Sequence, residues 1–331
     1  MSVTAAREED LLAIIRDAIG PSLPRRVLVG IGDDAAVWQP SRSHRSAITT
    51  DAFVDGVHFL RAAMAPHEIG MHAAAAALSD LAAMGARPLL VTVALGFPPD
   101  LRPEELRGLY EGMAAVCTRC GAGIAGGDLV RAPALTLAVT AVGEVRSSNV
   151  KRRTGAKIGD VLAVTGPLGA ARAGLHLLHD PQALTGALAE EAIAAFRRPL
   201  PRWREGMWLA ASVHVHAMMD LSDGLSTDLH RLAEASGRGI MVESIPVAPS
   251  AQAMALRRGE DPEGYALAGG DDYELLVAVA PRAFPYLASR FRARFGRPLL
   301  PVGRVDAESG VRRRTDSGIV PLASTGWDHL R

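Results

Sequence analysis

Short apolar runs alternate along this chain with longer segments in which apolar residues recur at helical spacing. We predict strands over residues 25–32, 45–53, 88–97, 134–145, 161–166, 214–220, 239–243 and 273–280. We predict helices over residues 8–19, 68–84, 103–120, 168–179 and 225–235. Strands that alternate with helices are typical of proteins in which helices cover a sheet. The sequence therefore predicts a mixed α/β fold in both halves of the chain.

One polar segment interrupts this alternation near the middle of the chain. Residues 146–160, RSSNVKRRTGAKIGD, are basic, contain two glycines and lie between two predicted strands. Such a segment is typical of a domain junction or an ordered loop, and 331 residues are enough for two domains. We therefore expect one domain over residues 1–146 and a second over residues 147–331. Residues 180–200 carry no motif, so a lid, a surface helix and a segment without function all remain open.

The charged residues balance, because 36 lysines and arginines face 36 aspartates and glutamates. A chain without net charge is not expected to bind nucleic acid or an anionic membrane through a general field. No apolar run approaches the roughly 18 residues of a membrane span, and the first residues lack the apolar core of a signal peptide. We expect a cytoplasmic protein.

The only two cysteines, Cys117 and Cys120, form one C-x-x-C within a predicted helix. No second pair completes a four-thiolate zinc site. We interpret them as ordinary helix residues, with a redox or metal-binding role as the alternative.

Lysine is rare, since Lys151 and Lys157 are the only two among 36 basic residues. A P-loop requires a lysine after its glycines, and the protein-kinase fold requires one on its third strand. Neither motif is present. If this chain binds a nucleotide, metal ions and arginines must hold most of the phosphate charge.

Five segments place aspartate beside glycine or a hydroxyl residue, within or directly after apolar stretches. Their acids are Asp33 and Asp34, Asp51, Asp80, Asp128, and Asp220 with Asp223. A carboxylate in an apolar setting is costly unless it is paired, hydrogen-bonded or bound to a metal. Mg²⁺ prefers hard oxygen ligands and often shares them with substrate phosphates. Each segment alone also fits a turn or a helix cap, but together they favour a magnesium and phosphate site.

The order of these motifs resembles one known family. The chain contains, between residues 31 and 330, IGDDAAV, TTDAFVDGVHF, LSDLAAMGARP, GGDLVRAP, RRTGAKIGD, MDLSDGLSTDL, GGDDYELL and TGWDHL. This order resembles the thiamine-monophosphate kinases, which are similar in fold to the aminoimidazole ribonucleotide synthetase superfamily. The resemblance implies a two-domain α/β fold, dimerisation through the amino-terminal sheet, and ATP in the cleft between the domains.

The resemblance also implies the reaction, which is direct transfer of the ATP γ-phosphoryl group to thiamine monophosphate. The products would be thiamine diphosphate and ADP, in the last step of thiamine diphosphate biosynthesis. Several Mg²⁺ ions are implied, K⁺ assistance stays open, and no covalent enzyme intermediate is expected. The implied metal ligands are Asp34, Thr49, Thr50, Asp51, Asp80, Asp128, Asp220 and Asp223, among which Asp34, Asp51, Asp80 and Asp128 would assist catalysis.

The family resemblance assigns further residues to the two substrates. Those implied for ATP are Tyr110, Gly127, Asp128, Arg153 and Ser222, with Gly126 beside them. Those implied for the acceptor are His58, Asp271 and Trp327. The family commonly has Glu at the position of Asp271, so the carboxylate here reaches one methylene less. Asp272 and Glu274 are interpreted as structural neighbours.

Other readings remain within and outside this superfamily. Selenophosphate synthetase, the hydrogenase-maturation carbamoyl dehydratase and aminoimidazole ribonucleotide synthetase would also bring ATP and Mg²⁺ to such aspartates. The first typically needs a reactive Cys in an amino-terminal glycine-rich segment and the second a Cys at its carboxyl terminus, and this chain has neither. A metal- or nucleotide-binding sensor without turnover is the nonenzymatic alternative.

Overall fold

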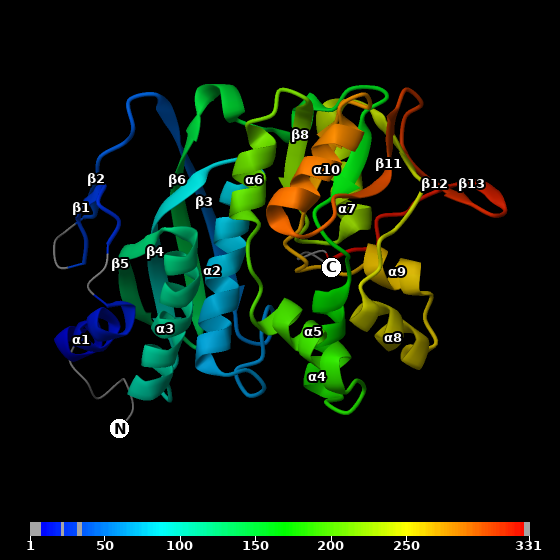
Figure 1. Cartoon of the computed structure of the whole chain (residues 1–331). Coiled ribbons are helices and arrows are strands. Elements are labelled where there is room, and N and C mark those ends of the chain that lie inside the picture. Colours follow the sequence, from blue (N-terminus) through cyan, green and yellow to red (C-terminus); the bar gives the residue numbers. More distant parts are fainter. Residues whose placement is uncertain (1–7, 21–22, 32–34, 328–331) are drawn as a thin grey trace. The chain divides into compact units, whose positions relative to one another are not determined.

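The computed structural model has the mixed α/β fold that the alternating pattern predicts (Figure 1). It describes residues 8–20, 23–31 and 35–327. The chain divides into two compact units, unit 1 over residues 1–81 and 86–147, and unit 2 over residues 82–85 and 148–331. The end of one predicted helix therefore groups with unit 2, which the sequence pattern did not indicate.

Unit 1 is built on a four-stranded sheet. Its elements are α1 (Glu8–Ile19), β1 (Val27–Val29), β2 (Val37–Trp38), β3 (His44–Val54), α2 (Pro66–Ala83), β4 (Arg87–Phe97), α3 (Pro103–Cys120), β5 (Gly123–Arg131) and β6 (Thr136–Arg146). The strand order is β3-β6-β4-β5, so β3 and β5 are the two edges. The pairings β3–β6 and β6–β4 are antiparallel, and β4–β5 is parallel.

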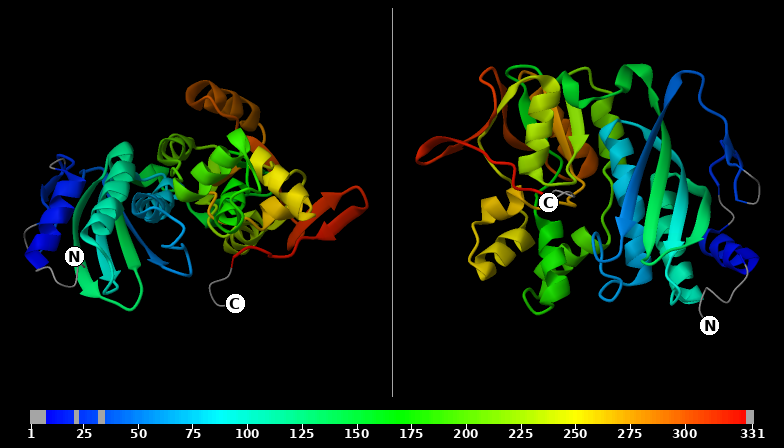
Figure 2. Two further views of the ribbon diagram at one scale, coloured as in Figure 1. Left: turned by 90° about the horizontal axis from the view of Figure 1, so that it is seen from below. Right: turned by 180° about the vertical axis from the view of Figure 1, so that it is seen from behind.

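The two faces of this sheet differ in exposure. Val91 and Val93 of β4 and Val139 of β6 are fully buried, and α2 and α3 lie over the sheet (Figures 1 and 2). Side chains of a strand point alternately to opposite faces. On β3, Phe53 is buried whereas Ile48 is 74% exposed. One face is therefore a core, and part of the other is open in this single chain.

Glycines allow α2 and α3 to approach each other closely. A Cβ on Gly112 would overlap the backbone oxygen of His67, and a Cβ on Gly70 would overlap that of Leu109. Each helix thus presents a glycine to the backbone of the other. This contact needs a residue without a side chain at both positions.

Unit 2 contains a seven-stranded sheet with helices on both faces. Its elements are η3 (Arg153–Gly155), β7 (Val161–Val164), α4 (Ala170–His179), α5 (Gly186–Arg197), α6 (Trp203–Ala210), β8 (Val215–Asp220), α7 (Leu225–Ser236), β9 (Gly239–Val242), α8 (Pro249–Arg258), α9 (Pro262–Leu267), β10 (Leu275–Val279), α10 (Phe284–Phe295), β11 (Leu300–Asp306), β12 (Val311–Thr315) and β13 (Gly318–Pro321). The short helix η2 (Ser147–Asn149) lies at the division between the units. The strand order is β13-β12-β9-β11-β7-β10-β8.

Two apolar clusters fill the space on either side of this sheet. Leu225, Leu229 and Leu232 of α7 pack in one of them. Leu209 of α6 and Phe291 of α10 pack in the other. The neighbouring strands β7, β10 and β8 contribute side chains to both clusters, so this end of the sheet is packed on both faces.

Several elements of unit 2 lie outside the predicted pattern. Residues 186–197 form α5, which packs with α4 and α8 around a third apolar cluster, so part of the segment without a motif is a helix of this group. Figure 2 shows the β12–β13 hairpin extending from the edge of the sheet. The predicted strand over residues 273–280 begins later, because Tyr273 adopts a left-handed backbone conformation.

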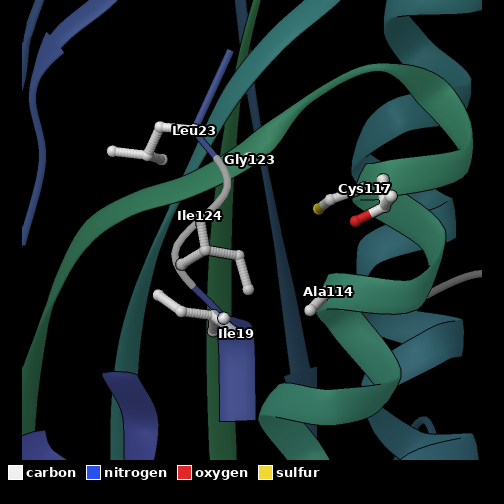
Figure 3. Close-up of a pocket in the computed structure, with 8 residues that line it drawn as sticks. Ile19, Leu23, Ala114, Cys117, Gly123 and Ile124 are labelled. Carbon is white, nitrogen blue, oxygen red and sulfur yellow. The ribbon is translucent and has the colours of Figure 1, made fainter. Parts of the chain in front are cut away.

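The two cysteines are free and buried on α3. Cys117 lines a small pocket with Ile19 and Gly20 of the α1 end, Leu23, and Ile124 of β5, and Figure 3 shows Cys117 facing Ile124. Burial raises the pKa of the Cys117 thiol. This setting is that of a packing residue rather than a reactive thiolate. In the described part of the chain, no helix is long and apolar enough to cross a membrane.

The helix contact of unit 1 can be tested with Gly112→Ala. Alanine in a helix interior usually stabilises relative to glycine by about 0.5–1 kcal/mol. Here we expect the opposite sign, a loss of about 1–3 kcal/mol in the free energy of unfolding, because the new Cβ overlaps the His67 backbone. Denaturant unfolding measures the change. Glu111→Ala, exposed on the same helix, is the control and should stay within about 0.5 kcal/mol. A stabilised Gly112→Ala variant would contradict the close contact.

Candidate functional site

In unit 2, the last residue of β8 and the segment that follows it carry three predicted site residues, Asp220, Ser222 and Asp223. Strand β8 ends at Asp220, which is buried, and residues 221–224 turn into α7. Gly224 adopts φ 104°, and a Cβ there would lie 3.0 Å from the Gly269 oxygen. A strand–turn–helix of this kind leaves the helix amide groups at the turn. We call residues 220–224 the aspartate loop.

Three successive carbonyl groups of the aspartate loop accept hydrogen bonds from two distant segments. The amide of Tyr273 donates to Leu221 at 2.9 Å, and that of Asp271 donates to Ser222 at 2.8 Å. The amide of Trp327 donates to Asp223 at 2.9 Å. The structure thereby brings together the predicted residues Asp220, Ser222, Asp223, Asp271 and Trp327.

A further acid, which sequence reasoning missed, lies beside the aspartate loop. Asp228 is fully buried in the first turns of α7, and its Oδ2 accepts from the Asp223 amide at 3.3 Å. Arg231 pairs with Asp228 at 2.9 Å and also with Asp223. Burial, with a contribution from the nearby Asp220 carboxylate, raises the pKa of Asp228 to about 7, although Arg231 opposes the shift. Only its spacing within MDLSDGLSTD could have indicated this residue.

The segment around Asp271 has an unusual backbone. Asp271 adopts φ 62° and Tyr273 φ 47°, both in the left-handed region. Aspartate is among the few non-glycine residues that enter this region with some frequency. The Tyr273 hydroxyl donates to Asp271 Oδ1 at 2.9 Å. Backbone and side chain together therefore orient the Asp271 carboxylate.

The two following acids have structural partners, as the sequence interpretation of Asp272 and Glu274 proposed. Asp272 accepts from the Gly169 amide at the start of α4, with distances of 2.8 and 3.0 Å. Glu274 is buried and accepts from Arg202 at 2.7 and 3.1 Å, from Arg297 at 2.6 Å and from the Thr165 hydroxyl at 2.5 Å. Burial alone would raise the pKa of Glu274, but the two guanidinium groups hold it below its ordinary value.

Arg153 lies in η3 with an exposed side chain. Its backbone oxygen accepts from the Ser236 hydroxyl at 2.5 Å. A Cβ on Gly155 would overlap the His216 oxygen, so this short helix lies directly against β8. The predicted ATP contact is thus exposed on a segment whose backbone is fixed.

In unit 1, two elements bring predicted residues together. Thr49 of β3 donates to Asp80 Oδ2 of α2 at 2.5 Å. Asp51 lies two residues along β3 from Thr49, so both side chains point to the same face of the sheet. Thr49, Asp51 and Asp80 therefore form a set of hard oxygen donors.

Thr50 and Asp128 are placed elsewhere in unit 1. The side chain of Thr50 points to the opposite face, where its hydroxyl lies 3.1 Å from that of Thr140. Asp128 lies on β5, at the other edge of the sheet from β3, and is exposed. Its neighbour Gly127 must lack a side chain for a structural reason, because a Cβ there would overlap the Val93 oxygen. The fold of unit 1 does not bring these residues to the Thr49 set.

The remaining predicted residues differ in how far their side chains are exposed to solvent. Tyr110 is only 3% exposed within the core, and burial raises its hydroxyl pKa. His58 is partly exposed, accepts from the Val54 amide at 3.1 Å and contacts the Phe53 ring. Asp34 lies outside the described residues. Among the residues that the structure describes, no group of three or more His, Cys, Asp or Glu side chains is arranged to hold a metal ion.

Family comparisons agree with this two-unit architecture. Residues 32–145 match the N-terminal domain of AIR synthase related protein, and residues 157–313 match the C-terminal domain of AIR synthase related protein. Together the two matches cover most of both units.

Individual relatives are similar over nearly the whole chain. Thiamine-monophosphate kinase of Synechococcus elongatus is 38% identical over 285 residues, which are 85% of this chain and 84% of that protein. The crystal structure of thiamine-monophosphate kinase from Stenotrophomonas maltophilia has a TM-score of 0.81 at 34% identity, over 95% of this chain and 97% of that one. AaThiL complexed with AMPPCP and TMP has a TM-score of 0.76 at 27% identity, over 99% of both chains.

The two arginine partners of the buried Glu274 predict a large effect of Glu274→Gln. Removing this charge leaves the partly buried Arg202 and Arg297 without their anion, so we expect a loss of about 2–4 kcal/mol in the free energy of unfolding at pH 7. The matched control is Glu190→Gln at the exposed Arg198 pair, with an expected change below about 1 kcal/mol.

The pH dependence follows from the lowered pKa of Glu274. A group whose pKa is lower in the folded state stabilises above its unfolded pKa, and this stability is lost as pH falls through the folded pKa. The parent protein should therefore lose more stability than Glu274→Gln on acidification below about pH 4.3. Equal acid sensitivity in denaturant unfolding would contradict the role of the pair.

Proposed function

This chain belongs to the thiamine-monophosphate kinase family. On this basis we propose how its residues serve the transfer of a phosphoryl group from ATP to thiamine monophosphate. The chain is an ATP-dependent kinase of thiamine monophosphate, which we abbreviate TMP. We propose that Mg²⁺ ions held by its aspartates join ATP to this acceptor, and that the reaction is the last step of thiamine diphosphate biosynthesis. The observation that carries the residue assignment is the hydrogen bonding of the aspartate loop to Asp271 and Trp327.

The donor sets fit Mg²⁺ in their chemistry. Thr49, Asp51 and Asp80 offer hydroxyl and carboxylate oxygens on one face of unit 1. Asp220 and Asp223 offer carboxylates in unit 2. Mg²⁺ takes oxygen ligands and is usually held by one or two carboxylates together with water and substrate phosphates. When bound, the ion would neutralise the phosphate charge that makes two polyanions repel each other.

The reaction requires positioning more than covalent chemistry from the protein. A phosphate oxygen of TMP attacks the γ-phosphorus of ATP in line, and ADP leaves. We propose that Arg153 binds ATP phosphate, since its side chain is exposed and its backbone oxygen accepts from the Ser236 hydroxyl. We propose Ser222 as a second ATP contact, since its carbonyl is fixed by the Asp271 amide.

The acceptor is assigned to Asp271, Trp327 and His58. Trp327 is half exposed, so its ring is available for a cationic thiazolium or a pyrimidine. Asp271 presents a carboxylate that Tyr273 orients. His58 is partly exposed and held by the Val54 amide. These assignments, with those of Thr50, Asp128, Gly127, Tyr110 and Asp34, remain proposals, and assistance by K⁺ stays open.

We further propose that the kinase is a homodimer that works in the cytoplasm. The open face of the unit 1 sheet carries Ile48, which is 74% exposed, beside Thr50 and Ala52, which are also exposed. An exposed apolar side chain among small ones suits contact with an identical sheet face. Free buried thiols are typical of a reducing compartment.

The kinase reaction is tested by a chromatographic assay with ATP, Mg²⁺ and TMP. We expect equal amounts of thiamine diphosphate and ADP, with no product when Mg²⁺ is omitted or when free thiamine replaces TMP.

Asp80→Asn should lower turnover by at least about a hundredfold with the fold intact, because one carboxylate of the Thr49 set becomes neutral. Folded parent protein that makes no thiamine diphosphate would overturn the function. Near-normal turnover of Asp80→Asn would overturn the role of that residue.

The dimer is tested with Ile48→Glu, which places a charge on the open face of unit 1. We expect the molar mass from light scattering to fall from that of two chains to that of one, because a buried unpaired carboxylate is costly. Val213→Glu, at a residue of unit 2 that is 80% exposed, should leave the mass unchanged. A monomeric parent protein, or a dimeric Ile48→Glu variant, would contradict this interface.

A further inference from the structure

The segment from Ser324 to Trp327, which we call the tail, is bound to the start of α7 by side-chain hydroxyls. Thr227 Oγ1 accepts from the Gly326 amide at 3.1 Å and lies 2.9 Å from the Ser324 hydroxyl. Ser226 Oγ accepts from the Thr325 amide at 3.1 Å. Two neighbouring hydroxyls on one helix turn therefore bind successive amides of the tail.

The last contact of the tail leads directly to the aspartate loop. The Trp327 amide donates to the Asp223 oxygen at 2.9 Å. Gly326 must lack a side chain, because a Cβ there would overlap the same oxygen and would lie 2.6 Å from Thr227 Oγ1. The backbone of the tail thus lies against both Thr227 and Asp223. This contact fixes the backbone position from which the Trp327 side chain extends.

The Trp327 ring itself remains half exposed. The backbone on its amino side is held by three hydrogen bonds to residues 223–227, whereas its ring is accessible to solvent. Such an arrangement suits an aromatic group that contacts a ligand, since ordering it before binding reduces the entropy lost on binding.

We propose that Thr227 and Gly326 are positioning residues that hold the Trp327 ring in place for the acceptor. This inference rests on the proposed role of Trp327 in binding TMP. Thr227 acts through the tail: its hydroxyl fixes the Gly326 amide, and Gly326 permits the contact with Asp223. Loss of the Thr227 hydroxyl, or a side chain added at position 326, releases the tail and weakens TMP binding, while ATP binding is retained.

The first test compares Thr227→Val, which keeps the shape but removes the hydroxyl, with Thr227→Ser, which keeps the hydroxyl. Hydrogen exchange measures the tail directly, and we expect about tenfold faster exchange of the Gly326 and Trp327 amides in Thr227→Val only. Calorimetry then measures TMP binding in the presence of Mg²⁺ and the ATP analogue AMPPCP. We expect about three- to tenfold weaker TMP binding by Thr227→Val, and an AMPPCP affinity within about twofold of the parent.

A second variant, Gly326→Ala, changes only the tail and leaves the core of unit 2 intact. We expect the same loss of TMP affinity and of amide protection, because the new Cβ overlaps the Asp223 oxygen. Ala323→Ser, at an exposed residue just before the tail, is the matched control and should behave as the parent.

The outcomes separate this inference from the proposed function. A parent protein that fails to bind TMP overturns the proposed function. A parent that binds TMP, with Thr227→Val and Gly326→Ala that bind it equally well, overturns only the positioning role. Unchanged amide exchange in both variants would also overturn it.

Discussion

The three carbonyl groups of residues 221–223 hold together the part of unit 2 to which we assign the chemistry. They accept amides from the segment at residues 271–273 and from the tail, which lie about 50 and 100 positions further along the chain. Main-chain bonds of this kind do not depend on the charge of a side chain. The loop can therefore keep Asp223 and Asp271 near each other even though two carboxylates repel.

The charges around this loop are compensated by arginine. Arg231 pairs with the buried Asp228, and Arg202 with Arg297 surrounds the buried Glu274. A guanidinium offers five donors in a fixed plane, so one residue can satisfy both oxygens of a carboxylate. This geometry lowers the free-energy cost of burying a carboxylate. A single ammonium group offers no planar pair of donors and offsets that cost less completely. The rarity of lysine in the sequence thus agrees with how the fold stabilises its acids.

Sequence patterns predicted the acids that end strands better than those held by distant partners. Asp220 and Asp223 follow an apolar run directly, so alternation of strand and turn indicated their place. Glu274 was interpreted only as a structural neighbour, because Arg202 and Arg297 lie far from it along the chain and their pairing requires the folded sheet. The division of Thr49 and Thr50 between opposite faces follows from the alternation of side chains along the predicted strand, but which of the two meets Asp80 of α2 depends on how the sheet packs.

The backbone conformation at position 271, rather than the length of the side chain, explains why aspartate suits this position. In the left-handed conformation that it adopts, aspartate is favoured over longer acids because its short side chain can bond locally. The Tyr273 hydroxyl donates to one carboxylate oxygen and so orients the group. A carboxylate held this way has less freedom than a glutamate at the same place. The conformation of residues 271–273, held by the carbonyls of Leu221 and Ser222, therefore fixes the position of the carboxylate that we propose for the acceptor.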